Sequence, residues 1–190
     1  ENDKAQQAVD YEIGIWRYLN HPHILQLHTS FITDFATFCI MDLVESGSLY
    51  DLINELRNNG QMGLNPGLAK TYAHQLAAAL RYMHADVRLV HRDVKLENCL
   101  LDMSASDAAT EGGDILLCDF GMADFIVRDD RDGPDPHSTG GNDTSTSIQG
   151  SLQYAAPELF NASGAVLFSP SADIWAFGVV LYALLTATLP

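Results

Sequence analysis

Basic residues are scarce in this chain, and their scarcity limits what the protein can bind. Lysine and arginine together number 10 against 25 aspartates and glutamates, which gives a net charge of −15 over 190 residues. Such a charge argues against a nucleic-acid binder and against attraction to anionic membranes. It favours basic protein substrates, although the solubility that a charged surface confers explains the acidity equally well.

Cysteine is also rare, and no long hydrophobic segment is present. Cys39, Cys99 and Cys118 each lie in an apolar run without metal-ligand spacing, which predicts buried free thiols in a reduced intracellular protein rather than disulfides. We find no signal peptide, and the apolar stretch 174–189 is short for a membrane span. We therefore expect a core helix there and a cytoplasmic protein, with the nucleus as the alternative location.

Hydrophobic residues make up 47% of the chain, enough for the core of one domain or of part of a larger one. Their spacing predicts helices and strands in alternation. Ser48 and Asn65-Pro66 have the character of helix N-termini. The predicted elements are a helix over 5–20, strands over 25–31 and 37–43, a short helix after Ser48, and a longer helix from residue 66 towards His91.

Residues 91–98, His-Arg-Asp-Val-Lys-Leu-Glu-Asn, carry the most informative chemistry of the chain. Asp93 can accept a hydroxyl proton, and Lys95 can neutralise charge that develops on a transferring phosphate. Asn98, five residues after Asp93, can bind Mg²⁺ through its amide oxygen. This spacing is suited to phosphoryl transfer.

Three further motifs follow in order. Asp119-Phe120-Gly121 comes after the apolar run 115–118, and Asp119 is a natural second Mg²⁺ ligand. The segment that begins at Gly150 closes with Ala-Pro-Glu at Glu158, and Asp173 begins the apolar helix. Together with residues 91–98, these motifs resemble those of eukaryotic protein kinases.

The resemblance implies an α+β, protein-kinase-like fold that is only partly present. Residues 1–41 are expected to form a truncated N-lobe (helix C and strands 4 and 5), and residues 42–46 the hinge. Residues 47–190 are expected to form an incomplete, mainly helical C-lobe, with the catalytic loop at 91–98 and the activation segment at 119–158. The cofactors implied are ATP and Mg²⁺, and the substrate is a protein with a serine or threonine acceptor.

The resemblance also implies a nucleotide site. Glu12 matches the helix C glutamate that pairs with a strand lysine, although a solvated helix glutamate is the alternative reading. The remaining positions of this site are the gatekeeper Met41, the adenine-binding hinge Asp42-Leu43-Val44, and Leu100 under the adenine ring. The resemblance further implies a hydrophobic spine that links helix C to the catalytic loop, formed by Trp16, Leu27, His91 and Phe120. Asp173 is expected to hold the backbone of the catalytic loop.

Lys95, two residues after Asp93, is similar to the serine/threonine class, in which Ser151 would shape the acceptor site. The flanking segments look most like the calmodulin-dependent and AMP-activated kinase group. Glu97 matches a position that some of these kinases use against an arginine of the substrate. Ser48 occupies a second such position, where many of these kinases have a glutamate. The expectation of a basic substrate is therefore weak.

Regulation is expected to involve Arg92, through which many kinases of the family bind a phosphate on the activation segment. Ser147 is the position that would carry that phosphate. Asp124, however, lies where a basic residue often shares it, and pairing of Asp124 with Arg92 is the alternative. The polar, acidic stretch 129–143 is expected to form a mobile loop.

The Gly-rich loop and the strand 3 lysine of the family are not among the 190 residues. We therefore expect a fragment of a kinase that transfers no phosphate by itself. Glu158 is expected to be a buried carboxylate whose arginine partner is missing. The alternative to an active parent enzyme is a pseudokinase that serves as a scaffold or allosteric binding module. A small-molecule phosphotransferase fits less well, because that class lacks the Ala-Pro-Glu segment.

Overall fold

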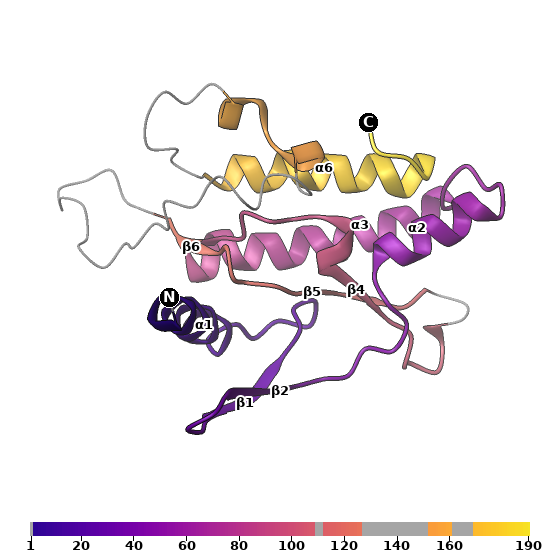
Figure 1. Ribbon diagram of the computed structural model, residues 1–190. Coiled ribbons are helices and arrows are strands. Elements are labelled where there is room, and N and C mark those ends of the chain that lie inside the picture. Colours follow the sequence, from indigo (N-terminus) through magenta and orange to yellow (C-terminus); the bar gives the residue numbers. More distant parts are fainter. Residues whose placement is uncertain (1, 109–111, 127–151, 161–168) are drawn as a thin grey trace.

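A computed structural model describes residues 2–108, 112–126, 152–160 and 169–190. Helix α1 and the β1–β2 hairpin lie together on one side of the molecule, and helices α2, α3 and α6 lie on the other (Figure 1). The bounds of the longer elements are α1 (Asn2–Trp16), β1 (Leu27–Ile32), β2 (Thr37–Met41), α2 (Leu49–Asn58), α3 (Pro66–Arg81), β4 (Cys99–Asp102), β5 (Asp114–Leu117) and α6 (Pro170–Thr186). Two short strands, β3 (Leu89–Val90) and β6 (Asp124–Phe125), pair with each other.

The N-terminal helix begins earlier and ends earlier than its periodicity predicts. At its C-terminal end the hydrogen bonds span three residues instead of four: the N–H groups of Tyr18 and Leu19 donate to carbonyls three residues earlier, at 3.1 and 3.0 Å. Such bonds are typical of a helix that tightens in its last turn. Ile13, Ile15 and Trp16 are buried, so the C-terminal half of α1 faces the core.

The β1–β2 hairpin is antiparallel, with Phe31 opposite Phe38 and an irregularity between Leu27 and Thr29. The first strand begins two residues later than predicted for a clear reason. The N–H of Leu25 donates to the carbonyl of Leu117 at 3.0 Å, so this part of the chain bonds to β5 rather than to β2.

Helices α2 and α3 begin at the predicted caps. The hydroxyl of Ser48 accepts from the N–H of Asp51, whose carboxylate accepts from the N–H of Ser48 at 2.8 Å. This reciprocal pair is a capping box. Asn65 accepts from the N–H of Leu68 at 2.9 Å, and α3 continues into a π-helical turn at Tyr82–Val87 that delivers the chain to β3.

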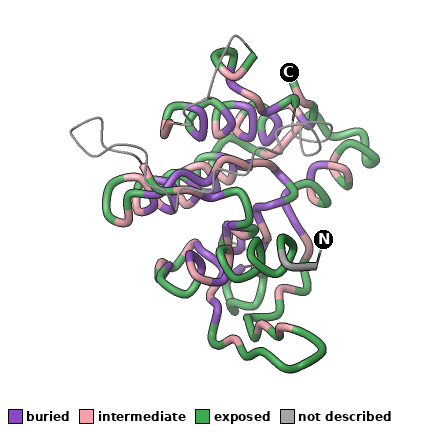
Figure 2. Tube along the Cα trace, turned by 60° about the vertical axis from the view of Figure 1, so that its left-hand side comes forward, coloured by how far each residue is buried: buried purple, intermediate pink, exposed green. Residues whose placement is uncertain are grey.

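Helix α6 confirms the core helix predicted over 174–189, although it begins at Pro170. Its buried residues, Ala172, Ala176, Val179, Val180 and Ala183 among them, lie on one face, and α6 packs on α3. Figure 2 shows buried positions along these helices, whereas the β1–β2 hairpin is mostly exposed. Among the residues described, no helix is both long and apolar enough to cross a bilayer.

All three cysteines are free thiols, as predicted, but only Cys99 is fully buried. Cys39 and Cys118 are half-buried, which corrects the expectation for these two. Burial raises the pKa of Cys118 to about 12, so its thiol stays protonated at neutral pH.

Candidate active site

Strand pairing brings the motifs of the sequence to one place. Residues 91–98 lie between β3 and β4, and Asp119 follows β5. Because β4 and β5 are antiparallel, with Cys99 opposite Leu117, the residues just before β4 and just after β5 meet at the same end of this hairpin. The N–H of Cys118 donates to the carbonyl of Asn98 at 3.0 Å, which holds Asn98 beside the segment that carries Asp119.

Asp93, Lys95 and Asn98 form a hydrogen-bonded cluster. Lys95 Nζ lies 2.5 Å from Asp93 Oδ2, and Asn98 Nδ2 donates to the same oxygen at 3.0 Å and to the Asp93 carbonyl at 2.9 Å. Both donors orient the carboxylate of Asp93. Because the amide nitrogen of Asn98 faces Asp93, its Oδ1 is the atom that can bind a metal ion.

His91 supports this cluster from within the core. Its side chain is fully buried, and burial lowers its pKa, so the ring is neutral. A neutral ring has one donor and one acceptor nitrogen, and both are used. Nε2 donates to the carbonyl of Cys118 at 3.1 Å, and Nδ1 accepts from the N–H of Asp93 at 3.2 Å. The ring thereby links the segment before Asp119 to the backbone of Asp93.

Asp119 is exposed and has a backbone φ of 65°, a conformation that is unusual for a residue other than glycine. Such strain is found where the surrounding structure holds a functional side chain in place. A Cβ at Gly121 would lie 3.4 Å from both Asp119 Oδ1 and Glu12 Oε2. Glycine at this position therefore leaves space next to both carboxylates.

Glu12 faces this space from α1. Burial and the neighbouring Asp119 raise its pKa above the ordinary value, and an N–H bond from Phe120 opposes the rise. Among the residues described, no lysine or arginine forms an ion pair with Glu12. Two neighbouring carboxylates that no described lysine or arginine neutralises make this a place where a cation is favourable.

Asp173 holds the backbone at the start of residues 91–98, which confirms its predicted role. Its side chain is only 2% exposed and accepts from the N–H groups of His91 and Arg92 at 2.8 and 2.9 Å. A third donor, His84 Nε2, lies 2.7 Å away, and sequence reasoning missed it. A buried aspartate signals the need for such donors, but His84 lies 89 residues away in the sequence and has no spacing that marks it.

The predicted spine is present as three rings in contact, packed at tilted and edge-on angles. Trp16 and Phe120 lie 6.1 Å apart between ring centroids, Phe120 and His91 lie 5.4 Å apart, and Leu27 is buried in the same core. The indole N–H of Trp16 donates to the carbonyl of Leu25 at 2.6 Å. These rings connect α1 to residues 91–98 through Phe120.

Arg92 pairs with Asp124, as the alternative reading of the sequence predicted. Arg92 Nη1 donates to Asp124 Oδ2 at 3.1 Å. Tyr11 Oη donates to the other carboxylate oxygen at 3.1 Å, and this residue was missed because it is 113 positions from Asp124.

The residues expected to bind adenine lie along the connection from β2 to α2 and on β4. Met41 ends β2, and the carboxylate of Asp42 accepts a hydrogen bond from His28 Nε2 at 2.7 Å. Leu43 is 83% exposed, whereas Val44 and Leu100 pack against the core. Leu100 also lies opposite Ser48 in an isolated bridge. The structure therefore brings Val44 and Leu100 to the core and leaves Leu43 in solvent.

The residues expected at the acceptor side are only partly described. Glu97 is exposed and bonds to the hydroxyl of Tyr154. Ser147, Ser151 and the expected mobile loop 129–143 lie outside the described residues. Glu158 is exposed, which corrects the expectation of a buried unpaired carboxylate: water solvates the charge at this position, so no burial penalty arises.

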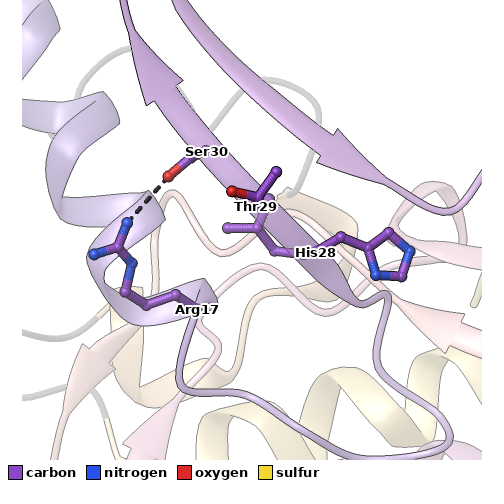
Figure 3. Close-up of a pocket in the computed structure, with 5 residues that line it drawn as sticks. Arg17, His28, Thr29 and Ser30 are labelled. Atoms are coloured by element: carbon purple, nitrogen blue, oxygen red, sulfur yellow. Dashed lines mark hydrogen bonds between the residues drawn. The ribbon is translucent and has the colours of Figure 1, made fainter.

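A pocket of about 240 Å³ lies elsewhere, between the end of α1 and β1 (Figure 3). Arg17, His28, Thr29 and Ser30 line it together with Leu27, and Arg17 donates to the hydroxyl of Ser30 at 3.0 Å. None of the four labelled residues belongs to the cluster around Asp93.

The motifs and their geometry agree with the comparisons to known proteins. Residues 1–190 match the protein kinase domain family. The chain belongs to the protein kinase family. This membership confirms the predicted kinase-like α+β fold, and kinases of this family in general use ATP and Mg²⁺ and act on protein substrates.

Curated relatives place this kinase chain near one group. It is 35% identical to "NUAK family SNF1-like kinase 2" of Rattus norvegicus over 94% of its length. It is 35% identical to "SNF1-related protein kinase catalytic subunit alpha KIN12" of Arabidopsis thaliana over its whole length, and 31% identical to "Protein kinase kin1" of Schizosaccharomyces pombe over 94%. The predicted resemblance to serine/threonine kinases of the AMP-activated group is confirmed. The chain spans 24%, 32% and 17% of these relatives.

Proposed function

We propose that this chain is part of a serine/threonine protein kinase that transfers the γ-phosphate of ATP to a protein hydroxyl. The cluster of Asp93, Lys95 and Asn98 carries this proposal. Asp93 accepts the proton of the acceptor hydroxyl as the hydroxyl oxygen bonds to the γ-phosphorus and the bond to the β-phosphate breaks, releasing ADP. Lys95, already 2.5 Å from Asp93, neutralises the charge that develops on the transferring group.

The residues present fit a magnesium ion. Asn98 Oδ1 and the Asp119 carboxylate are hard oxygen ligands, and Mg²⁺ prefers a few such ligands completed by phosphate oxygens and water. The described residues contain no cluster of three or more His, Cys, Asp or Glu side chains suited to a metal, so nucleotide phosphates would complete the coordination. Bound there, Mg²⁺ would neutralise phosphate charge.

We propose that adenine binds to the backbone of Asp42-Leu43-Val44, with Met41 as gatekeeper and Leu100 beneath the ring. Backbone recognition is consistent with the 83% exposure of the Leu43 side chain. Residues 42–46 would then be the hinge between a partial N-lobe, 1–41, and a partial C-lobe, 47–190. Glu12 would pair with the strand 3 lysine that binds the nucleotide phosphates. The raised pKa of Glu12 next to Asp119 is in keeping with a need for such a cation.

The acceptor side is proposed to prefer basic proteins. The net charge of −15 and the exposed Glu97 support this preference, and the same charge disfavours nucleic acids and anionic membranes. Ser151 would bond to Asp93 and Lys95 to shape this side, and Glu158 would close the activation segment 119–158. Ser147 is the sequence position that would carry a regulatory phosphate, although Asp124 already pairs with Arg92. A cytoplasmic or nuclear location fits an enzyme with such substrates and free cysteines.

The test is transfer of γ-labelled phosphate from Mg²⁺-ATP by the full-length protein to four peptides. Three are basic and differ only in a serine, threonine or tyrosine acceptor, and the fourth is an acidic serine peptide. We expect transfer to the basic serine and threonine peptides. Asp93→Asn is expected to lower the rate at least 100-fold, because a positioned general base contributes about 10²- to 10⁴-fold.

Lys95→Met and Asp119→Asn are expected to lower the rate as well, and Lys70→Met, at an exposed position on α3, is the matched control for the lysine. The isolated 190-residue chain is expected to transfer nothing, because Glu12 has no ion-pair partner among the residues described. A wild-type protein that binds ATP but transfers no phosphate would instead identify the pseudokinase alternative, a scaffold or allosteric binding module. Transfer that persists in Asp119→Asn would overturn the proposed metal site.

A further inference from the structure

The carboxylate of Asp124 joins three elements that are far apart in the sequence. Its Oδ1 accepts from Tyr11 Oη of α1 at 3.1 Å and from the N–H of Phe125 at 2.8 Å. Its Oδ2 accepts from Arg92 Nη1 of the catalytic loop at 3.1 Å. The pairing of β6 with β3, in which Asp124 lies opposite Val90, fixes the backbone of Asp124 next to the start of that loop. One side chain thus connects α1, β6 and the loop.

The charge and protonation of each residue determine what it does in this connection. The Arg92 side chain is only 14% exposed, and burial lowers its pKa, while Asp124 is the largest influence that opposes this shift. The Tyr11 hydroxyl keeps its proton, since burial and Asp124 raise its pKa to about 12. Tyr11 is therefore a hydrogen-bond donor to Asp124 throughout the neutral range, and Asp124 is a counter-ion that Arg92 needs.

On the side of the loop, Arg92 is held at both ends. Its backbone has a φ of 71°, which is strained for a residue with a side chain, and its N–H donates to Asp173 Oδ1 at 2.9 Å. Its guanidinium is held by Asp124. The next residue is Asp93, so the position of Arg92 determines where the proposed base lies.

On the side of the helix, Tyr11 precedes Glu12, whose carboxylate accepts from the N–H of Phe120. The N-terminal half of α1 is largely exposed, and its buried residues lie towards the other end. A bond at Tyr11 therefore fixes the rotation of the helix at the point where Glu12 must face Asp119. Loss of that bond leaves this turn of α1 less restrained.

We propose that Tyr11 and Asp124 are positioning residues, which tie helix α1 to the catalytic loop through Arg92 and so hold Glu12 and Asp93 in register for phosphoryl transfer. This inference rests on the proposed kinase function and adds how the chain holds the active arrangement of Glu12 and Asp93. The tie is made of side chains that the chain itself supplies. A phosphate placed next to Arg92 would meet the negative charge of Asp124, so the tie replaces a phosphorylated residue rather than waiting for one.

The experiment uses the full-length protein with Tyr11→Phe, Asp124→Asn and the double variant. Tyr18→Phe, just after α1, and Asp34→Asn, in the turn between β1 and β2, are the matched controls. Steady-state kinetics give kcat and the KM for the basic serine peptide. The difference between the near-ultraviolet circular dichroism spectra recorded with and without Trp16→Phe isolates the Trp16 signal, which reports how α1 packs against Phe120.

We expect Tyr11→Phe to lower kcat about fivefold, the effect of one net hydrogen bond. Asp124→Asn is expected to lower it about tenfold or more, because a charge-assisted bond is stronger. KM for the peptide is expected to stay unchanged, and the double variant to match Asp124→Asn, since both residues act through one connection. Multiplied effects in the double variant, or an unchanged kcat in Asp124→Asn, overturn the proposal.

The proposed function and the tie can fail separately. If the wild-type protein transfers no phosphate, the kinase proposal fails and the Trp16 signal decides the tie. A changed signal in Tyr11→Phe and Asp124→Asn, with unchanged controls, supports the tie in that case, whereas identical signals in all variants refute it.

Discussion

Replacing Asp173 tests how strongly the catalytic loop depends on one buried carboxylate. Asp173→Asn keeps the shape of the side chain but turns one oxygen into an N–H₂ group. In the wild-type protein, Oδ2 accepts from His84 Nε2 and the N–H of His91, and Oδ1 accepts from the N–H of Arg92. Either orientation of the amide therefore places a donor against at least one backbone donor in a site that is 2% exposed.

The magnitude follows from the bonds that are lost. A buried donor left without a partner costs about 1–3 kcal/mol, and a bond to a charged group contributes about 1.5–3 kcal/mol. Release of the left-handed backbone at Arg92 returns about 1–2 kcal/mol. Asp173→Asn is therefore expected to lower the free energy of unfolding by about 2–3 kcal/mol. Asp173→Ala, which removes every acceptor, is expected to cost about 3–5 kcal/mol.

Chemical denaturation of the full-length protein measures this loss, and Asp34→Asn is the exposed control. Hydrogen exchange provides the local signature, because the amides of His91 and Arg92 are expected to lose protection in Asp173→Asn before the rest of the core does. An Asp173→Asn protein within 0.5 kcal/mol of wild type, with these two amides still protected, would refute the reasoning.

Three further outcomes are expected. Ser48→Ala removes the cap of α2 and is expected to lower the free energy of unfolding by about 1 kcal/mol in urea titrations, and a loss near zero would show that the capping box contributes nothing. In the isolated 190-residue chain, Glu12→Gln is expected to raise the melting temperature at pH 7 and to have no effect below pH 4.5, the ordinary pKa of this group. The sign follows because a raised pKa means that the ionised form is disfavoured in the folded state, so the cost appears as pH rises through the ordinary pKa. A Glu12→Gln protein that is less stable than wild type at pH 7 would contradict this reasoning. Ser147→Ala is expected to leave kcat unchanged, since Arg92 is already paired with Asp124, and a tenfold loss of kcat would show that a phosphate is needed.

Local features of the fold could be predicted closely, and the reason is their short range. Ser48 and Asp51 are three residues apart, as are Asn65 and Leu68, so each cap depends only on residues within one helical turn. Element ends were predicted less well. The β1 strand starts late because Leu25 bonds to Leu117, a partner that no local pattern reveals.

The same contrast holds in the candidate site. Residues 91–98 and Asp119 could be recognised from residue types and spacing alone, and Asp173 could be assigned to the loop by resemblance. His84 and Tyr11 could not, because their partners lie 89 and 113 residues away. The exposure of Glu158 also depends on packing, and the sequence predicted the opposite.

The sequence by itself determined the chemistry of this kinase chain: a candidate base, a lysine and two oxygen ligands, at spacings that local backbone geometry can bring together. Tertiary structure decided how these groups are held. It placed Asp124 between Tyr11 and Arg92, and it surrounded Asp173 with three donors. The physical reason is that buried charges and donors must find partners wherever the fold brings them, and those contacts depend on packing between distant segments rather than on sequence spacing.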